Sequence, residues 1–340
     1  MATKEWAAKQ PTGKPSSVKR TKIVPHLWFD DRAIEAAKFY ASVFPKSHVD
    51  DVTAEPADSP SGPAGSVDIV EFTVFDQPFV AFNAGPLFQL NPSISFIVNF
   101  DPLFFGRPES REDKARLELD KAWQKLSEGG QAFMPIDKYP FSERYGWIQD
   151  KYGVSWHLML TNPEGEPRPP IIPSMLFVGK NVGRAEEAID FYVSVFRDSE
   201  RGSLSRYGPN QAPDKEGTIM FGDFMLEKQW FAAMDSAREH NFTFSEAVSL
   251  MVNCENQKEI DYYWERLSAV PESEQCGWVK DRFGVSWQIA PTVLEEMMKD
   301  DDRGAAKRAA EAMLKMKKLD IAELERAFDA ATDAPLGPPP

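Results

Sequence analysis

The feature that most constrains this 340-residue chain is an internal duplication. The segment GWIQDKYGVSWHL at 146–158 returns as GWVKDRFGVSWQI at 277–289, and AIEAAKFYASVF at 33–44 returns as AEEAIDFYVSVF at 185–196. Two shorter pairs, QPFVAFN with QWFAAMD and SISFIVN with AVSLMVN, keep the same order along the chain. Because composition alone does not conserve order, the pattern indicates one structural module that is present twice.

The repeat and the breaks around it predict the domain organisation. The segment NPEGEPRPP, at 162–170, is too rich in Pro and Gly for regular structure and separates the two copies. An apolar stripe in the segment after the second copy predicts helices that pack back on the body. The predicted parts are a disordered arm at 1–20, a first domain at 21–161, a linker at 162–170, a second domain at 171–292, C-terminal helices at 293–330 and a tail at 331–340.

Composition excludes several classes of partner. The net charge is -14, so the surface repels nucleic-acid phosphates and anionic membranes. No apolar run reaches the roughly 18 residues that span a bilayer. Two Cys make no disulfide framework, and we expect a cytoplasmic protein. The basic, acid-poor start leaves a mitochondrial presequence as an alternative to a disordered arm.

Local periodicity predicts an α+β fold. Residues 23–29 are rich in β-formers, 66–75 alternate apolar and polar residues, and 144–160 indicate a hairpin with a DxxG turn. Apolar residues recur at helical spacing in 33–44, with Asp30 or Asp31 as the expected N-cap. Helices mixed with mostly antiparallel strands are typical of the α+β class.

These motifs together resemble one protein superfamily. PHLWFDDRAIEAAKFYASVFPKS, DQPFVAFNAGP, SFIVNF, GWIQDKYGVSWHLM and EQCGWVKDRFGVSWQIAP are similar to the vicinal-oxygen-chelate superfamily, which includes glyoxalase I, bleomycin-resistance proteins and extradiol dioxygenases. Within it the chain resembles a tandem form of the PhnB-like branch, labelled "3-demethylubiquinone-9 3-methyltransferase". The resemblance implies two tandem cupped, mostly antiparallel sheets built from paired βαβββ modules. Each copy would form its own cup, and the two cups would make a pseudo-dimer within one chain, itself a monomer or a homodimer.

The resemblance also implies where the chemistry lies. Metal-dependent relatives carry ligands on the opening and closing strands, where the first copy has His26 and His157, and at two further positions near Asn83 and Ser93. Asn and Ser bind transition metals poorly, so we expect no cofactor and a metal-free pocket. The alternative is a divalent metal held by His26, His157 and Glu71.

We predict that His26 and His157 form a catalytic proton-transfer pair in one cavity, because their unperturbed pKa of roughly 6.5 suits that role. The ligand-binding residues expected around them are Asn83, Ser93, Ser95, Glu71 and Gln288. The second copy places Ser174, Asp235, Ala247 and Gln288 at the matching positions, which indicates a structural partner or a second pocket.

Four tryptophans and two aspartates recur in the hairpins. Trp147, Trp156, Trp278 and Trp287 are interpreted as core residues, with an aromatic wall for a flat ligand as the alternative. If His157 faces the cup, strand alternation turns its neighbour Trp156 toward the helices. Asp150 and Asp281 are interpreted as turn formers. An insertion at 129–140 in the first copy is either a lid over the cup or a plain surface loop.

The functional hypothesis is an enzyme of lyase, isomerase or cyclase type that acts on an oxygen-bearing or aromatic metabolite in the first cup. The alternatives are a non-catalytic protein that sequesters a ligand, as bleomycin-resistance proteins do, and a scaffold. The polar pair in the first copy favours chemistry over scaffolding. We discount the methyltransferase label, because the chain shows no glycine-rich strand-to-helix loop of the kind that binds S-adenosylmethionine.

Overall fold

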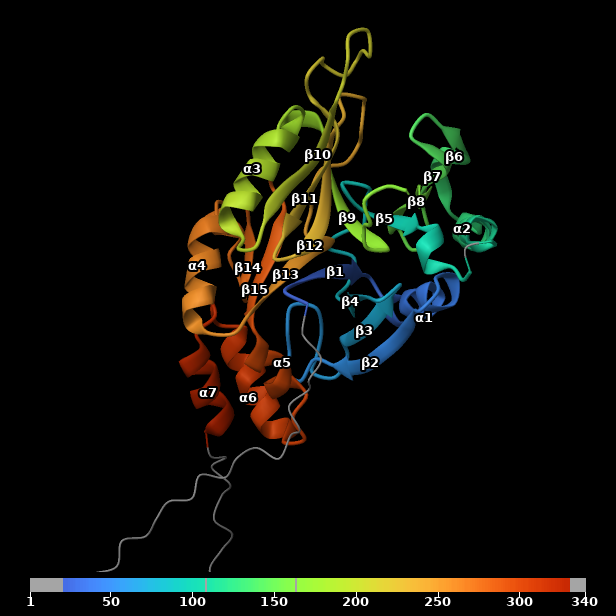
Figure 1. The fold of residues 1–340 in the computed structure, drawn as a ribbon. Helices are drawn as coiled ribbons and strands as arrows, with labels where there is room; N and C mark the ends of the chain where they lie inside the picture. The colour runs from blue at the N-terminus through green and yellow to red at the C-terminus, as the bar shows by residue number, and fades with distance from the viewer. Residues whose placement is uncertain (1–20, 108, 163, 331–340) are drawn as a thin grey trace, which may run out of the picture.

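The computed structural model describes residues 21–107, 109–162 and 164–330. The predictions for the arm at 1–20 and the tail at 331–340 lie outside these residues. The described chain forms two mixed sheets, of seven and eight strands, with helices packed against them (Figure 1). The predicted α+β class with two tandem modules and C-terminal helices is confirmed.

The first copy forms the elements that its periodicity predicts. The predicted strand at 23–29 is β1, and the predicted helix at 33–44 is α1, which ends one residue earlier. The elements are β1 (Ile23–Phe29), α1 (Ala33–Val43), β2 (His48–Ala54), β3 (Asp68–Val74), β4 (Gln77–Asn83), β5 (Ile94–Phe100), η1 (Pro102–Phe104), α2 (Arg111–Ser127), β6 (Gln131–Tyr139), β7 (Ser142–Gln149) and β8 (Ser155–Leu160).

The second copy repeats this order with one strand fewer. The insertion at 129–140 of the first copy forms β6, which pairs with β7 at the edge of its sheet, and β6 has no counterpart in the second copy. The elements are β9 (Ile171–Phe177), η2 (Gly179–Asn181), α3 (Ala185–Val195), β10 (Glu200–Arg206), β11 (Ile219–Leu226), β12 (Gln229–Asp235), β13 (Val248–Cys254), α4 (Gln257–Leu267), η3 (Pro271–Ser273), β14 (Trp278–Lys280) and β15 (Ser286–Pro291).

Three helices follow the second copy: α5 (Thr292–Met298), α6 (Arg303–Met313) and α7 (Ile321–Asp329). Met297, Leu319 and Leu324 form a small buried cluster between them. The backbone N–H of Cys276 donates to the carbonyl of Met316 at 2.9 Å, which joins the helical segment to the second copy. The prediction that these helices pack back on the body is confirmed.

The strand order shows that neither sheet belongs to one copy. The seven-stranded sheet runs β14-β15-β13-β1-β4-β3-β2, and the eight-stranded sheet runs β10-β11-β12-β9-β5-β8-β7-β6. Each sheet therefore joins the first half of one copy to the second half of the other. The expectation that each copy forms its own cup is wrong.

Two antiparallel seams make this exchange. β1 pairs with β13, where His26 lies opposite Ser249, and β5 pairs with β9, where Ser95 lies opposite Ser174. Pairing within each copy would satisfy the same number of backbone groups, because the exchangeable strands β5 and β13 are both seven residues long. The exchange consequently leaves the local periodicity of every strand unchanged.

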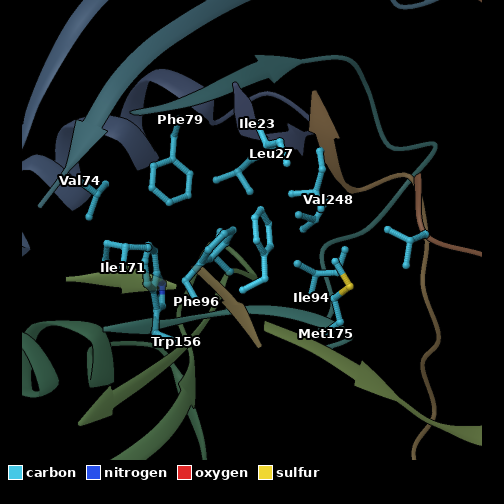
Figure 2. Packing of buried hydrophobic residues seen from close by; sticks show 14 of the residues in the cluster. Ile23, Leu27, Val74, Phe79, Ile94, Phe96, Trp156, Ile171, Met175 and Val248 are labelled. Carbon is cyan, nitrogen blue, oxygen red and sulfur yellow. The ribbon is translucent and has the colours of Figure 1, made fainter. Parts of the chain in front are cut away.

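Strand alternation turns one face of each sheet toward the helices and a shared core. Leu27 and Val248 of one sheet lie across from Ile94 and Met175 of the other, with Phe96 between them (Figure 2). All five side chains are buried in one cluster. The opposite face of each sheet is left to carry the candidate sites.

Candidate functional site

The candidate sites are the two sheet faces that point away from the core. We call the face of the seven-stranded sheet that carries His26 cup 1, and the face of the eight-stranded sheet that carries His157 cup 2. In each cup, one row of four side chains crosses four neighbouring strands. The row is Ser249, His26, Val80 and Glu71 in cup 1, and Ser95, Ser174, Ala232 and Asp223 in cup 2.

His26 forms the floor of cup 1 and is buried. The amide of Gln288 donates from Nε2 to Nδ1 of His26 at 3.1 Å and to Oγ of Ser249 at 2.9 Å. Because Nδ1 accepts, the proton of the neutral ring lies on Nε2. This Nε2 atom has no hydrogen-bond partner among the residues that the structure describes. Cup 1 therefore offers one buried N–H donor to an oxygen atom of a ligand.

Burial also fixes the charge of both histidines. It lowers the pKa of His26 to about 3 and the pKa of His157 to about 3, because a charged ring loses its hydration in the interior. Both rings are neutral at physiological pH. The expectation of rings that titrate near pH 6.5 is wrong for these positions.

Aromatic side chains line cup 1 around His26. The ring of Phe82 meets His26 edge-on, with centroids 6.1 Å apart, and Trp278 lies 6.4 Å from Phe82. Trp28 packs on Phe82 at 5.4 Å. These three side chains are partly exposed, whereas His26 is buried. They form an apolar wall beside the unpartnered Nε2–H of His26.

His157 occupies a different place in cup 2 and is fully hydrogen-bonded. Oγ of Ser95 lies 2.8 Å from Nε2, and the hydroxyl of Tyr145 lies 2.6 Å from Nδ1. Trp147 stacks on the imidazole, with ring centroids 5.0 Å apart. Within the described part of the chain, the Oγ atom of Ser174 in cup 2 has no hydrogen-bond partner; Ser174 is fully buried and takes the place of His26 in the row.

A carboxylate ends each row, and an internal cation holds it. Nζ of Lys299 lies 2.5 Å from Glu71 in cup 1, and Nε of Arg168 lies 2.9 Å from Asp223 in cup 2. Lys299 comes from the segment after β15, and Arg168 from the linker after β8, so the cations occupy corresponding parts of the repeat. The Glu71 side chain is 27% exposed and the Asp223 side chain 8%, so the Lys299–Glu71 pair of cup 1 is the more solvated one.

The two histidines do not meet, because β1 and β8 belong to different sheets. The prediction of a shared His26–His157 cavity is therefore wrong, and the metal set of His26, His157 and Glu71 does not form. In cup 1 the groups near His26 are the amide of Gln288 and the hydroxyl of Ser249, and the carboxylate of the row, Glu71, is ion-paired two strands away; this set does not fit a transition metal. Among the described residues, no three His, Cys, Asp or Glu side chains make a ligand group.

The other predicted ligand-binding residues are divided between the cups. Gln288 and Glu71 lie in cup 1, whereas Ser95 on β5 lies in cup 2, and Ser93 directly precedes β5. Ser93 and Ser95 are both buried. No single pocket contains the predicted set.

Asn83 lies on the helix side of β4 and not in a cup. Its Oδ1 accepts the backbone N–H of Ala33 at 2.7 Å, and its Nδ2 donates to Asp68 at 2.9 Å. Asn83 therefore satisfies the first turn of α1, the role that the sequence analysis gave to Asp30 or Asp31. Both the ligand-binding role of Asn83 and the aspartate cap are wrong.

Strand alternation places two of the four hairpin tryptophans on the helix side of the sheets and two on the cup faces. Trp156 and Trp287 are buried toward the helices, where Nε1 donates to Asp150 at 2.8 Å and to Asp281 at 2.9 Å. Each aspartate also accepts backbone N–H groups of its own turn, as expected of a turn former. Trp147 and Trp278 lie on the cup faces beside His157 and Gln288, so the core interpretation is wrong for these two.

A surface cleft of about 460 Å³ lies beside cup 1 and shares Trp28 with its aromatic wall. The β1–α1 corner and the β7–β8 turn line it, with Arg32, Lys151 and Tyr152 among its residues. Arg32 is already bound to Glu35 at 2.8 Å, and Tyr152 donates to the same carboxylate. We therefore place the chemistry in the cups.

Sequence reasoning missed the two ion pairs and the tyrosine beside His157. Aligning the repeats places Glu71 opposite Asp223, so a carboxylate at the same position in both copies was a readable signal. The positions of Lys299 and Arg168 gave no such signal, because long cations reach the row from irregular segments. Tyr145 gave no signal as a partner of His157 in the sequence.

Comparison with known proteins identifies relatives of the whole repeat. The model of the family "3-demethylubiquinone-9 3-methyltransferase" matches residues 21–159 and again 169–290. No curated protein matches. No helix among the described residues is long and apolar enough to cross a membrane.

Solved structures give three further likenesses. The putative 3-demethylubiquinone-9 3-methyltransferase, PhnB protein, of Bacillus cereus aligns over its whole length with 42% of this chain, at 30% identity and a TM-score of 0.34. Glyoxalase I from Zea mays aligns over 98% of its length with 82% of this chain, at 10% identity and a TM-score of 0.46. A putative dioxygenase from Bacillus subtilis aligns over 94% of its length with 89% of this chain, at 12% identity and a TM-score of 0.40.

Proposed function

The chain belongs to the 3-demethylubiquinone-9 3-methyltransferase family, a PhnB-like branch of the vicinal-oxygen-chelate superfamily, and from this premise we propose that it binds a small carbonyl compound in cup 1 and acts on it as a lyase or isomerase. The proposal does not include the methyl transfer of the family's description. The groups that cup 1 provides are a hydrogen-bond donor and an ion-paired carboxylate, and the proposal is built on these.

One observation carries the proposal: the buried Nε2–H of His26 has no partner among the described residues. An unmade hydrogen bond of this kind costs about 1–3 kcal/mol, which a ligand oxygen would recover. Because the pKa of His26 is lowered to about 3, the ring donates as a neutral imidazole. A neutral imidazole polarises a carbonyl group without adding a charge to the site.

The row around His26 supports a proton-transfer reaction. Glu71 lies two strands from His26, about 10 Å at the level of the backbone. A small carbonyl compound bridges this span, with its oxygen at His26 and its α-carbon toward Glu71. Polarisation of the carbonyl makes the α-proton more acidic, and we assign its removal to the Glu71 carboxylate, which Lys299 holds in place. The aromatic side chains of Phe82 and Trp278 favour a flat or apolar substrate body.

Exchange of α-protons tests this function without knowledge of the product. Acetophenone in D₂O is followed by proton NMR, and the full chain is expected to speed the loss of the methyl signal. The variants His26→Leu and Glu71→Gln should each lower that rate at least about tenfold. His48→Leu makes the same change at a histidine that is 62% exposed, and should leave the rate unchanged.

Two results would count against the enzyme. Equal exchange rates for His26→Leu and the unchanged chain would remove His26 from the reaction. Binding of acetophenone without any exchange would favour the alternative of a protein that sequesters its ligand.

A further inference from the structure

We propose that cup 2 is a second binding site, for a small apolar carboxylic acid, and that Arg168 of the linker between the copies binds the carboxylate of this acid. The site lies on the other sheet from His26, and the proposal is independent of the reaction in cup 1. It rests on three features of cup 2: an unpartnered hydroxyl, an apolar floor and a partly free guanidinium.

The unpartnered hydroxyl is that of Ser174. Its side chain is fully buried, and its Oγ has no hydrogen-bond partner among the described residues. Ser95, which lies opposite it on β5, is already bonded to His157 and cannot satisfy it with the same geometry. A hydroxyl both donates and accepts, so Ser174 can bind a hydroxyl or an ether oxygen of a ligand.

The apolar floor lies beside this hydroxyl. Ile97, Ile172 and Ala232 form a buried cluster on three neighbouring strands, and Met159 and Trp230 pack on it while remaining partly exposed. The thioether chain of a methionine is unbranched and adapts to the shape of its neighbours. We expect Met159 to move aside and to let an aliphatic ring or short chain rest on the isoleucines.

Arg168 lies at the far end of this floor. Its Nε donates to Asp223 at 2.9 Å, and its guanidinium lies over the ring of Trp230 at 3.8 Å, so two contacts fix its plane. Its other side-chain partner, Glu166, is 84% exposed and binds through Nη1 at 3.2 Å. Nη2 has no hydrogen-bond partner within the described part of the chain. A ligand carboxylate that replaces Glu166 can therefore form the two parallel bonds that guanidinium groups favour.

The cation of cup 1, Lys299, is more completely paired than Arg168. Lys299 lies within 4 Å of three carboxylates, at 2.5 Å from Glu71, 3.0 Å from Glu295 and 3.8 Å from Asp51. Its charge is already more than balanced, and an acid would meet net repulsion there. Carboxylate binding should consequently distinguish cup 2 from cup 1.

The spacing sets the size of the acid. Ser174 and Asp223 lie two strands apart, about 10 Å at the backbone. The side chains of Ser174 and Arg168 shorten this span from both ends. An acid with one six-membered ring and a hydroxyl group opposite the carboxylate matches the remaining length.

Calorimetric titration of the full chain tests the site with defined probes. The probes are trans-4-hydroxycyclohexanecarboxylate and trans-4-(hydroxymethyl)cyclohexanecarboxylate, each with its carboxamide as an uncharged match. We expect at least one acid to bind at one site per chain and its amide to bind at least about tenfold more weakly, because the charge-assisted bonds to Arg168 are lost. Binding should also change the fluorescence of Trp230, which lies against Arg168, and the change should be absent in Trp230→Phe.

Variants locate the bound acid. Arg168→Gln combined with Asp223→Asn removes the pair without leaving a buried charge, and should weaken binding at least about tenfold. Ser174→Ala should weaken it by a smaller factor of about three to ten. Arg184→Gln, which removes an arginine from an exposed pair with Glu187, is the matched control and should bind the acid as the unchanged chain does.

Three results would overturn the proposal. They are no binding of either acid up to 10 mM as the probe concentration, equal binding of acid and amide, and loss of binding in Lys299→Gln rather than in the Arg168 variant. The last result would place the acid in cup 1.

Discussion

Cup 1 and cup 2 are built on the same row of positions, yet their single histidines stand at different places and in different states. His26 lies in the row itself and keeps one donor free, whereas His157 lies one strand beyond the row and has both nitrogens bonded. The comparison teaches that a buried histidine with two hydroxyl partners is chiefly a structural group. The histidine with a free N–H is the one that a ligand can use.

The exchange of strands explains how the two cups came to differ. The first copy contains both histidines, but its halves lie in different sheets. His26 is hydrogen-bonded by Gln288 of the second copy, whereas His157 is hydrogen-bonded by Ser95 and Tyr145 of its own copy. Gln288 bonds His26 from the position that His157 has in cup 2, and Ser174 takes the place that His26 has in the other row. Differences between the copies are thereby shared between both cups.

The largest expected effect tests whether the two sheets, with the helices packed against them, are equally stabilised by their buried tryptophans. Trp156→Ala and Trp287→Ala should each lower the free energy of unfolding by about 3–5 kcal/mol, because both rings are fully buried and hydrogen-bonded to a turn aspartate. Urea denaturation of both variants measures the cost. A difference of more than about 2 kcal/mol between the two variants would show that the two sheets are not equally stabilised.

The face of the sheet on which each side chain lies was largely predictable from the sequence, because it depends on the alternation of residues within a strand. Alternation alone placed Trp156 on the helix side once His157 was assigned to the cup, and the repeat predicted the same for Trp287. The same reasoning was available for Asn83, which has the parity of the core residues Phe79 and Ala81 on β4. The family resemblance instead predicted a ligand-binding position for Asn83, and that prediction is wrong.

The partner of each strand was not predictable in the same way. His26 on β1 can face a serine in either arrangement, because SISFIVN and AVSLMVN carry a serine at the same place, Ser95 or Ser249. Which one it meets depends on the path of the connecting segments and not on any pattern within the strands. The location of the site within the fold was therefore readable, whereas the set of residues that shares it was not.

A second prediction compares the two histidines directly. His157→Leu should cost about 2 kcal/mol or more, because the hydroxyls of Ser95 and Tyr145 lose a buried partner. His26→Leu should cost less than His157→Leu, because it removes a single hydrogen bond, from Gln288, together with a donor that is already unsatisfied. Urea denaturation at pH 7 measures both, and a larger cost for His26→Leu would reverse our reading of the cups.

A third prediction uses pH. The folded pKa of each histidine, about 3, lies below its unfolded value of about 6.5, so the unfolded chain binds a proton that the folded ring does not. The stability that depends on each neutral ring is therefore complete above about pH 6.5, and falls by about 1.4 kcal/mol per pH unit as the pH drops toward 3.

Asp150 acts in the opposite direction, because burial raises its pKa to about 6 and its contribution is lost as the pH rises through that value. The measurement is therefore a difference: unfolding of the unchanged chain and of each His→Leu variant at pH 7 and pH 5. Each variant should lose less stability than the unchanged chain over this interval. An identical loss would show that the histidine is not buried in a neutral form.

The most direct test of the central claim is a pair of double-mutant cycles on the free energy of unfolding. The claim is that His26 shares cup 1 with Gln288, 262 positions away, and does not share a cup with His157. We predict a coupling energy of about 0.5–3 kcal/mol between His26→Ala and Gln288→Ala, and additivity within about 0.5 kcal/mol between His26→Ala and His157→Ala. Coupling between the two histidines, with additivity toward Gln288, would contradict the exchange of strands and return both histidines to one cup.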